Sequence, residues 1–296
     1  MMKRIVALAV MSMCASSAGL VSAQGPPQGP PKVIMIQREE IKPGKMTAHE
    51  KLAHGYVQAF ANAKAATHWI GMTPVAGNEN EAFFLTPYAS YAAIEKDRRD
   101  TEKMMTGALK AAVDQLDQQG VDIHTSSRQL IAEYRADLSY NPTVNFPQMR
   151  YVEITTTRVR PGRERDFEEA RKIVKAAHER ARIDEHFAIF EVATGALAQT
   201  YLTLTPFKSL DEWDVETHGQ PYLSALGEEN RKNIDKMRAE GVISVESTLY
   251  AINPMMTYAP PEFAAADPGF WGPKKATSAK GAAAKKPTAK PAAKTQ

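Results

Sequence analysis

Apolar and polar positions alternate along two stretches of the chain, Val33–Ile41 and Tyr151–Val159, and both stretches are rich in β-branched residues. This alternation predicts β-strands, and the Pro-Gly pair that follows each stretch predicts a turn. After each turn, apolar residues recur at helical spacing. They are Leu52, Tyr56, Ala59, Phe60 and Ala63 in the first case and Phe167, Ala170, Val174, Ala177 and Ala181 in the second.

Both stretches continue with the same series of predicted elements. Two short strands are expected at about 68–75 and 82–86, and again at 186–192 and 200–204. A helical region follows at about 100–118 and 221–239, and a last strand at about 128–134 and 247–252. Each half of the chain therefore has the order βαββαβ.

The two halves are copies of one unit. The segment 41–45 recurs 118 residues later as 159–163, and His68-Trp69 matches His186-Phe187 at the same offset. The offset becomes 119 where 84–88 matches 203–207, and we align the last strands, 130–132 and 249–251, at 119 as well. The conserved order of these matches indicates a tandem duplication.

The predicted fold is α+β, with two tandem ferredoxin-like βαββαβ units. One unit spans 33–142 and the other 143–261. Each forms a four-stranded antiparallel sheet with both helices on one face, which leaves the other face bare. Two such units are expected to cover each other's bare faces and to close a fused α/β barrel.

The ends of the chain differ in composition from this body. Residues 1–23 have two positive charges, an apolar stretch and a small-residue site before Gln24, which predicts a signal peptide. The single cysteine, Cys14, would leave with it. Residues 24–32 are a Pro/Gly-rich linker, and 262–296 are predicted to be a disordered tail rich in Lys, Ala and Pro. We expect an exported protein, periplasmic or secreted, without a membrane span in the mature chain.

The charge is divided between body and tail. The formal net charge is +3, and residues 274–296 hold seven Lys and no acid. Without those and the two charges of the signal, residues 24–273 carry −6. The basic tail is expected either to solubilise the protein or to tether it to anionic surfaces of the cell envelope. Nucleic acid is not an expected partner of an exported chain.

Several polar residues are candidates for chemistry. The alternation, with Val152 and Ile154 placed under the helices, turns Tyr151 and Glu153 toward the barrel interior, and Glu39 likewise in the first half. Burial raises the pKa of a carboxyl, so Glu153 is a candidate general base. The alternative is that both carboxylates reach solvent or pair with a residue such as Arg128.

Histidines and aromatic residues supply further candidates. His68 and His186 head equivalent strands, so pseudo-twofold symmetry brings them to related positions, either as structural residues or as a proton-shuttling or metal-binding pair. His49, His54 and His124 show no ligand spacing, and His178 is expected in the core. The candidate ligand-binding residues are Trp69, Tyr151, Phe187, Tyr201, Trp213 and Tyr250, although aromatic residues in such a fold also simply fill the core.

Common catalytic motifs are absent from the sequence. It has no GxGxxG after a strand, no GxxxxGK[ST], no GxSxG and no EF-hand loop. Nucleotide hydrolysis, hydride transfer in a Rossmann site and serine hydrolysis are therefore unsupported.

Over residues 33–261 the chain resembles the dimeric α/β-barrel superfamily, which includes antibiotic-biosynthesis-monooxygenase-like and NIPSNAP-like proteins. The resemblance rests on the element order, on Thr-Pro-aromatic after the third strand of each half, and on Trp213 followed by the segment that begins at His218. Haem-degrading members bind iron through a histidine in this helix, which implies such a role for His218. The superfamily also contains cofactor-free oxygenases, isomerases and proteins without known activity.

The leading hypothesis is an exported protein that binds a small apolar or aromatic molecule inside the barrel, with no cofactor expected. A cofactor-free or haem-dependent oxygenase-like enzyme is the first alternative, with Glu153 and His218 as catalytic residues. A structural module tethered by the tail is the second. Whether the protein is an enzyme, and whether it is a monomeric pseudo-dimer or a homodimer, stays open.

Overall fold

The structure is a computed structural model that describes residues 29–215 and 219–272. The predicted signal peptide, the first part of the linker, His218 and the Lys-rich segment from residue 273 lie outside the described residues.

The helices and strands follow the predicted order in both halves. The first half contains β1 (Val33–Ile41), α1 (Met46–Asn62), β2 (Ile70–Ala76), β3 (Glu81–Tyr88), α2 (Tyr91–Met104), α3 (Gly107–Gly120) and β4 (His124–Tyr134). After the short 3-10 helix η1 (Phe146–Gln148), the second half contains β5 (Tyr151–Val159), α4 (Glu164–Ala181), β6 (Ala188–Thr194), β7 (Thr200–Phe207), η2 (Leu210–Asp214), α5 (Gln220–Leu226), α6 (Glu228–Gly241) and β8 (Val242–Ile252). The short helices α7 (Pro261–Ala266) and α8 (Pro268–Trp271) end the described chain.

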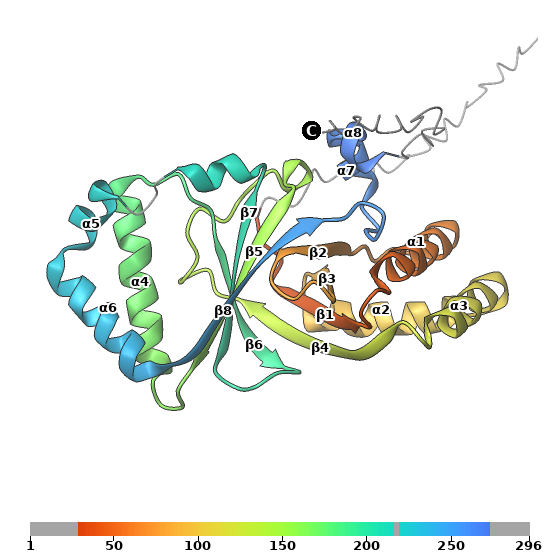
Figure 1. Cartoon of the computed structure of the whole chain (residues 1–296), viewed down its shortest axis with the longest axis horizontal. Coiled ribbons are helices and arrows are strands. Elements are labelled where there is room, and N and C mark those ends of the chain that lie inside the picture. The colour runs from red at the N-terminus through yellow and green to blue at the C-terminus, as the bar shows by residue number, and fades with distance from the viewer. Residues whose placement is uncertain (1–28, 216–218, 273–296) are drawn as a thin grey trace, which may run out of the picture.

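The eight strands form one closed antiparallel barrel in the order β1-β3-β2-β8-β5-β7-β6-β4. Each half supplies four neighbouring strands, and the halves join where β2 pairs with β8 and β4 pairs with β6. Helices α1, α2 and α3 lie on one side of the barrel and α4, α5 and α6 on the other (Figure 1). The predicted α+β class and fused barrel are confirmed, and the two halves close on each other within one chain.

The register of the last strands differs from the sequence alignment. Ile36 of β1 pairs with Leu130, and Ile154 of β5 pairs with Thr248. The last strands are therefore equivalent at an offset of 118, and the alignment at 119 is wrong by one residue. Because side chains alternate between the two faces of a strand, this slip exchanges inward and outward positions.

The predicted faces of the first strand in each half are also reversed. Ile34 and Ile36 of β1 and Val152 and Ile154 of β5 belong to the core inside the barrel. The alternate residue Val33 packs instead with residues on the α2 side. Both faces of these strands are buried, one against the interior and one against helices, so apolar alternation alone does not identify the inner face.

Each second helical region is interrupted. The sequence predicts one helix here in each half, whereas the structure has two, α2 with α3 and α5 with α6. Gly227 separates α5 from α6 and has φ +79, in the left-handed region that glycine adopts without strain. The helix pairs broaden the outer layer that covers the barrel.

The folded region extends past the predicted tail boundary at residue 262. Phe263 of α7 is buried and packs against the core inside the barrel. The indole Nε1 of Trp271 donates a hydrogen bond to the carbonyl oxygen of Pro147 at 2.7 Å, and Arg150 forms an ion pair with Asp267. Residues 262–272 are therefore part of the fold, and α7 covers one end of the barrel.

Among the described residues, no helix combines the length and the apolar character that crossing a membrane requires.

Candidate functional site

A cavity of about 530 Å³ lies at one end of the barrel. The beginnings of β1, β2, β5 and β6 and the ends of β3 and β7 form its walls, and the segments 29–31 and 142–147 and α7 complete it. Its lining residues are mostly apolar and include Ile34, Trp69, Ile70, Met72, Leu85, Phe146, Val152, Phe187, Ala188, Phe190, Leu204 and Phe263. An eight-stranded barrel of this kind has room for one small ligand.

His68 and His186 both line this cavity, and they are the titratable residues among its described lining. Both side chains are half-buried. Nδ1 of His186 lies 2.7 Å from the carbonyl oxygen of Asn141, to which it donates a hydrogen bond when protonated. The imidazole of His68 packs against the ring of Tyr258 at an interplanar angle of 42°, with the ring centroids 4.4 Å apart. The duplicated positions therefore converge on one cavity.

Burial lowers the pKa of His68 below its usual 6.5, although a hydrogen bond to the backbone of Tyr258 and the charge of Glu262 act in the opposite direction. The imidazole is consequently neutral near pH 7. A neutral histidine and an apolar wall favour an uncharged ligand or ligand portion over an ion, because an unpaired buried charge is costly.

The structure brings together only part of the predicted ligand-binding set. Trp69 and Phe187 line the cavity at equivalent positions of the two halves. Tyr151, Tyr201, Trp213 and Tyr250 are not among its lining residues. Tyr201 packs on Phe167 beneath α4, and Trp213 is half exposed in η2. The alternation of β5 predicts Tyr151 inside the barrel, but the structure places the opposite set of side chains there.

Glu153 is not in the barrel interior either. It occupies the same face of β5 as the residues that turn away from the interior core, and Oε1 accepts a hydrogen bond from Oγ of Ser247 at 2.5 Å. The predicted position of Glu153 in the barrel interior is therefore wrong, because the inward and outward faces of β5 were exchanged, while its role as a base stays a prediction. The predicted catalytic partner His218 lies outside the described residues.

A buried carboxylate does lie in the barrel interior, that of Glu81, which is 5% exposed. Its Oε2 accepts hydrogen bonds from Arg38, at 2.7 Å from Nη2 and 3.2 Å from Nε, and its Oε1 accepts one from the hydroxyl of Tyr250. Arg38 and Tyr250 line a second, smaller pocket of about 90 Å³, whose lining residues differ from those of the large cavity. Because Arg38 and Tyr250 occupy both of its oxygens, Glu81 forms a structural ion pair and is not free to act as a base.

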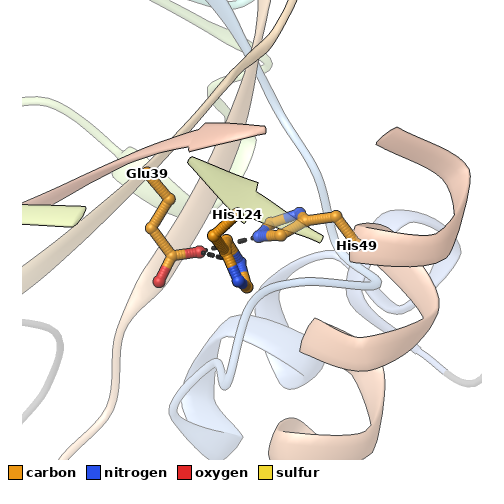
Figure 2. A group of neighbouring side chains, drawn as sticks. All are labelled: Glu39, His49 and His124. Atoms are coloured by element: carbon orange, nitrogen blue, oxygen red, sulfur yellow. Dashed lines mark hydrogen bonds and ion pairs between the residues drawn. The ribbon is translucent and has the colours of Figure 1, made fainter. Parts of the chain in front are cut away.

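A second polar group lies outside the barrel, between β1, α1 and β4 (Figure 2). Oε2 of Glu39 lies 2.7 Å from Nε2 of His49 and 3.3 Å from Nε2 of His124. His49 is almost completely buried, at 1% exposure, whereas His124 is half-buried. Although burial acts to raise it, the pKa of Glu39 is lowered, because His49, His124 and Gln37 stabilise the ionised carboxylate.

Sequence reasoning missed this cluster. Its members lie at separate places in the chain and match no ligand motif, and the reversed faces placed Glu39 in the interior. The available signal was the pairing of β1 with β4, which sets Ile41 opposite His124. Together with a helix packed over the outward face of β1, that pairing brings the three side chains together.

No protein-family model matches the chain, and no curated protein matches it. Solved structures do resemble it. They include a proposed monooxygenase from Fusobacterium nucleatum subsp. nucleatum, with 11% identity and a TM-score of 0.48 over 74% of this chain and 91% of that one. An anthrone oxidase-like protein has 14% identity and a TM-score of 0.47 over 75% and 91%.

A variant chlorite dismutase from Candidatus Nitrospira defluvii has 8% identity and a TM-score of 0.44 over 76% of this chain and 92% of that one. Likeness at this level of identity and TM-score carries no argument about ligand or reaction. Those follow from the site itself.

Proposed function

We propose that the protein binds one small, uncharged, mainly apolar or aromatic molecule in the cavity at the end of the barrel. The observation that carries the proposal is the cavity itself, about 530 Å³ of space with an apolar lining and two histidines. Its volume is in the range of roughly 300–1,000 Å³ that is typical of small-molecule sites.

The lining residues suggest which groups of the ligand they contact. Trp69 and Phe187, related by the duplication, offer ring surfaces for a planar group. His68 and His186 are the candidates to contact a hydroxyl or carbonyl group of the ligand. Because the described lining contains no Lys, Arg, Asp or Glu, a ligand with a formal charge would have to keep that charge outside the cavity.

Haem fits this cavity incompletely. The imidazole of His68 or His186 is a chemically suitable iron ligand. The two propionates of haem, however, find no cationic side chain among the described lining residues. His218, the residue that the superfamily resemblance suggests as the iron ligand, lies outside the described residues.

An oxygenase-like activity on the bound molecule is the second candidate function, and the pair of histidines in an otherwise apolar cavity is the observation that favours it. Neutral His68 is suited to accept a proton from a hydroxylated aromatic substrate. Export to the periplasm or beyond, and attachment of the basic tail to anionic envelope surfaces, belong to the proposal on the basis of sequence composition.

The ligand-binding proposal is tested on residues 24–296 purified from an exporting host. Native mass spectrometry detects a retained molecule, and titration with the neutral fluorophore N-phenyl-1-naphthylamine measures binding directly. We expect one saturable site for the fluorophore. Any molecule identified in this way is then incubated with the protein in air. An oxygenase would incorporate oxygen into this molecule, which mass spectrometry detects as a change in its mass, whereas a protein that only binds it would leave its mass unchanged.

Ala188→Phe provides the decisive variant, because Ala188 lines the cavity and packs against the interior core. Filling this space should weaken fluorophore binding at least tenfold. Leu197→Phe is the matched control, since Leu197 is 59% exposed in the connection between β6 and β7. Leu204→Trp is a second cavity-filling variant in case the first does not fold. Equal affinity of the wild type and a folded cavity-filling variant would refute the proposal.

A further inference from the structure

The cluster of Glu39, His49 and His124 has the composition of a metal site. One potential ligand atom from each residue lies within 4.8 Å of the others. Two imidazole nitrogens and one carboxylate oxygen are a ligand set that proteins use for Zn²⁺ and for other divalent transition metals. The three side chains converge from β1, α1 and β4, as Figure 2 shows.

The distances suit an ion that bridges the three residues. Zinc with bonds of about 2.0–2.1 Å in tetrahedral geometry holds its ligand atoms about 3.3 Å apart. The separation of Glu39 Oε2 from His124 Nε2 is already 3.3 Å, and that from His49 Nε2 is 2.7 Å. An opening of the Glu39–His49 contact by about half an ångström would complete this part of the geometry.

Glu39 is prepared for this role by its surroundings. Nε2 of Gln37 donates a hydrogen bond to Oε1 of Glu39, and Nε2 of Gln129 donates one to Oε1 of Gln37 at 2.8 Å. These two hydrogen bonds orient the carboxylate of Glu39 and leave its Oε2 facing the two histidines. Residues around known metal sites orient the ligands by hydrogen bonds in the same way.

An ordinary ion pair accounts less well for both histidines. One carboxylate oxygen, Oε2 of Glu39, faces two ring nitrogens. Nε2 of His124 is buried, yet it makes no hydrogen bond within the described part of the chain despite its 3.3 Å distance to Glu39. A buried polar atom without a hydrogen bond is uncommon and calls for a physical explanation. A bound cation provides one.

The equivalent positions in the second half of the chain do not contain this cluster. Thr157, Phe167 and Val242 replace Glu39, His49 and His124 at the constant offset of 118 residues. Phe167 belongs there to an apolar core beneath α4. The duplicated fold therefore does not require two histidines and a glutamate at these places, and the first half has a property that the second lacks.

We propose that Glu39, His49 and His124 bind one divalent transition-metal ion, with Zn²⁺ as the best fit. Three protein ligands leave a fourth position for a water molecule, as catalytic zinc sites have. The ion would connect α1 to β1 and β4. The site is separate from the barrel cavity, because none of its three residues lines that cavity.

The test uses tag-free protein of residues 24–296, stripped with chelator and titrated with Zn²⁺ by calorimetry, and with Co²⁺ by visible absorption. We expect one equivalent of Zn²⁺ to bind, visible bands from ligand-field transitions with Co²⁺, and a higher melting temperature with Zn²⁺. Absence of stoichiometric binding to the wild type at pH 7.5 would overturn the proposal.

His124→Gln and Glu39→Gln should each weaken Zn²⁺ binding by at least tenfold and abolish the Co²⁺ bands. His54→Gln is the matched control, since His54 is on the same helix as His49 but outside the cluster, and it should bind as the wild type does. His124→Gln is the safer variant because His124 is only half-buried. Binding that survives in folded His124→Gln, or that is lost equally in His54→Gln, would also overturn the proposal.

Discussion

Tyr250 of β8 donates a hydrogen bond to the buried carboxylate of Glu81 in β3, and so connects the second half of the chain to the first inside the barrel. The other oxygen of Glu81 is bound by Arg38 of β1. Burial, reinforced by Glu81, raises the pKa of Tyr250, so its hydroxyl stays protonated and remains a donor. Tyr250, Glu81 and Arg38 thus form a polar network with satisfied hydrogen bonds inside a largely apolar core.

Tyr250→Phe should lower the free energy of unfolding by about 1–3 kcal/mol, because it leaves one oxygen of buried Glu81 without its donor. Urea unfolding of the variant and the wild type measures the difference. Tyr134→Phe is the matched control, since Tyr134 also packs against the interior core while its hydroxyl makes no hydrogen bond to another described residue. Similar losses in the two variants would contradict the role assigned to the network.

The close approach of Gly195 to β4 gives a second prediction. Gly195 has φ +89, and an added Cβ would lie 2.2 Å from the carbonyl oxygen of Gln129. Gly162 has a similar φ of +85 but open space around it. Gly162→Ala should therefore cost about 1 kcal/mol from backbone strain alone, and Gly195→Ala about 1–3 kcal/mol more from the clash. Thermal or urea unfolding compares the two, and equal costs would show that the clash is relieved without penalty.

Much of the fold was predictable from local pattern and repetition. The bounds of β1 and β5 coincide with the predicted strands, because alternation and a following Pro-Gly turn define both ends. The inner face was not predictable in this way. Val33 and Ile34 are both buried, one toward α2 and one inside the barrel. The hydrophobicity of these residues therefore does not show which of the two alternating sets of side chains faces the barrel interior. Only the strand pairing, a long-range property, decides which residues face the cavity.

The candidate sites also differ in how far the sequence predicts them. The duplication correctly indicates that His68 and His186 are related, and both line the cavity. Glu39, His49 and His124 could not be recognised together, because the chain brings them into contact only through the packing of α1 and the pairing of β1 with β4. Spacing motifs detect ligands that share one element, and this cluster draws on three.

Two truncations test the extent of the folded chain. Removal of residues 273–296 should leave the melting temperature unchanged. Removal of 261–296 also deletes Phe263, the Trp271–Pro147 hydrogen bond and the Arg150–Asp267 ion pair, and should destabilise the protein by roughly 2–4 kcal/mol and weaken ligand retention in the cavity. Calorimetric unfolding of both truncated proteins makes the comparison. An equal effect of the two deletions would place the stabilising contacts beyond residue 272.

The lowered pKa of Glu39 predicts how stability depends on pH. Its usual value is 4.5, and in the folded protein it is lower despite burial, because His49 donates to the ionised carboxylate. The unfolded chain therefore binds more protons than the folded one as the pH falls below that value. The stabilisation from Glu39 is fully present above pH 4.5 and is lost as the pH falls through the folded pKa.

Glu39→Gln should accordingly be less stable than the wild type near pH 7, and this difference should shrink as the pH falls from 4.5 to 3. Urea unfolding measures the free energy of unfolding of both proteins, and a chelator in the buffer removes any contribution from bound metal. Exposed Glu79→Gln controls for the loss of one negative charge. A difference between the wild type and Glu39→Gln that stays constant over this range would mean that Glu39 is not ionised preferentially in the folded state. The contacts from His49, His124 and Gln37 would then not stabilise the ionised carboxylate of Glu39 beyond what water does in the unfolded chain.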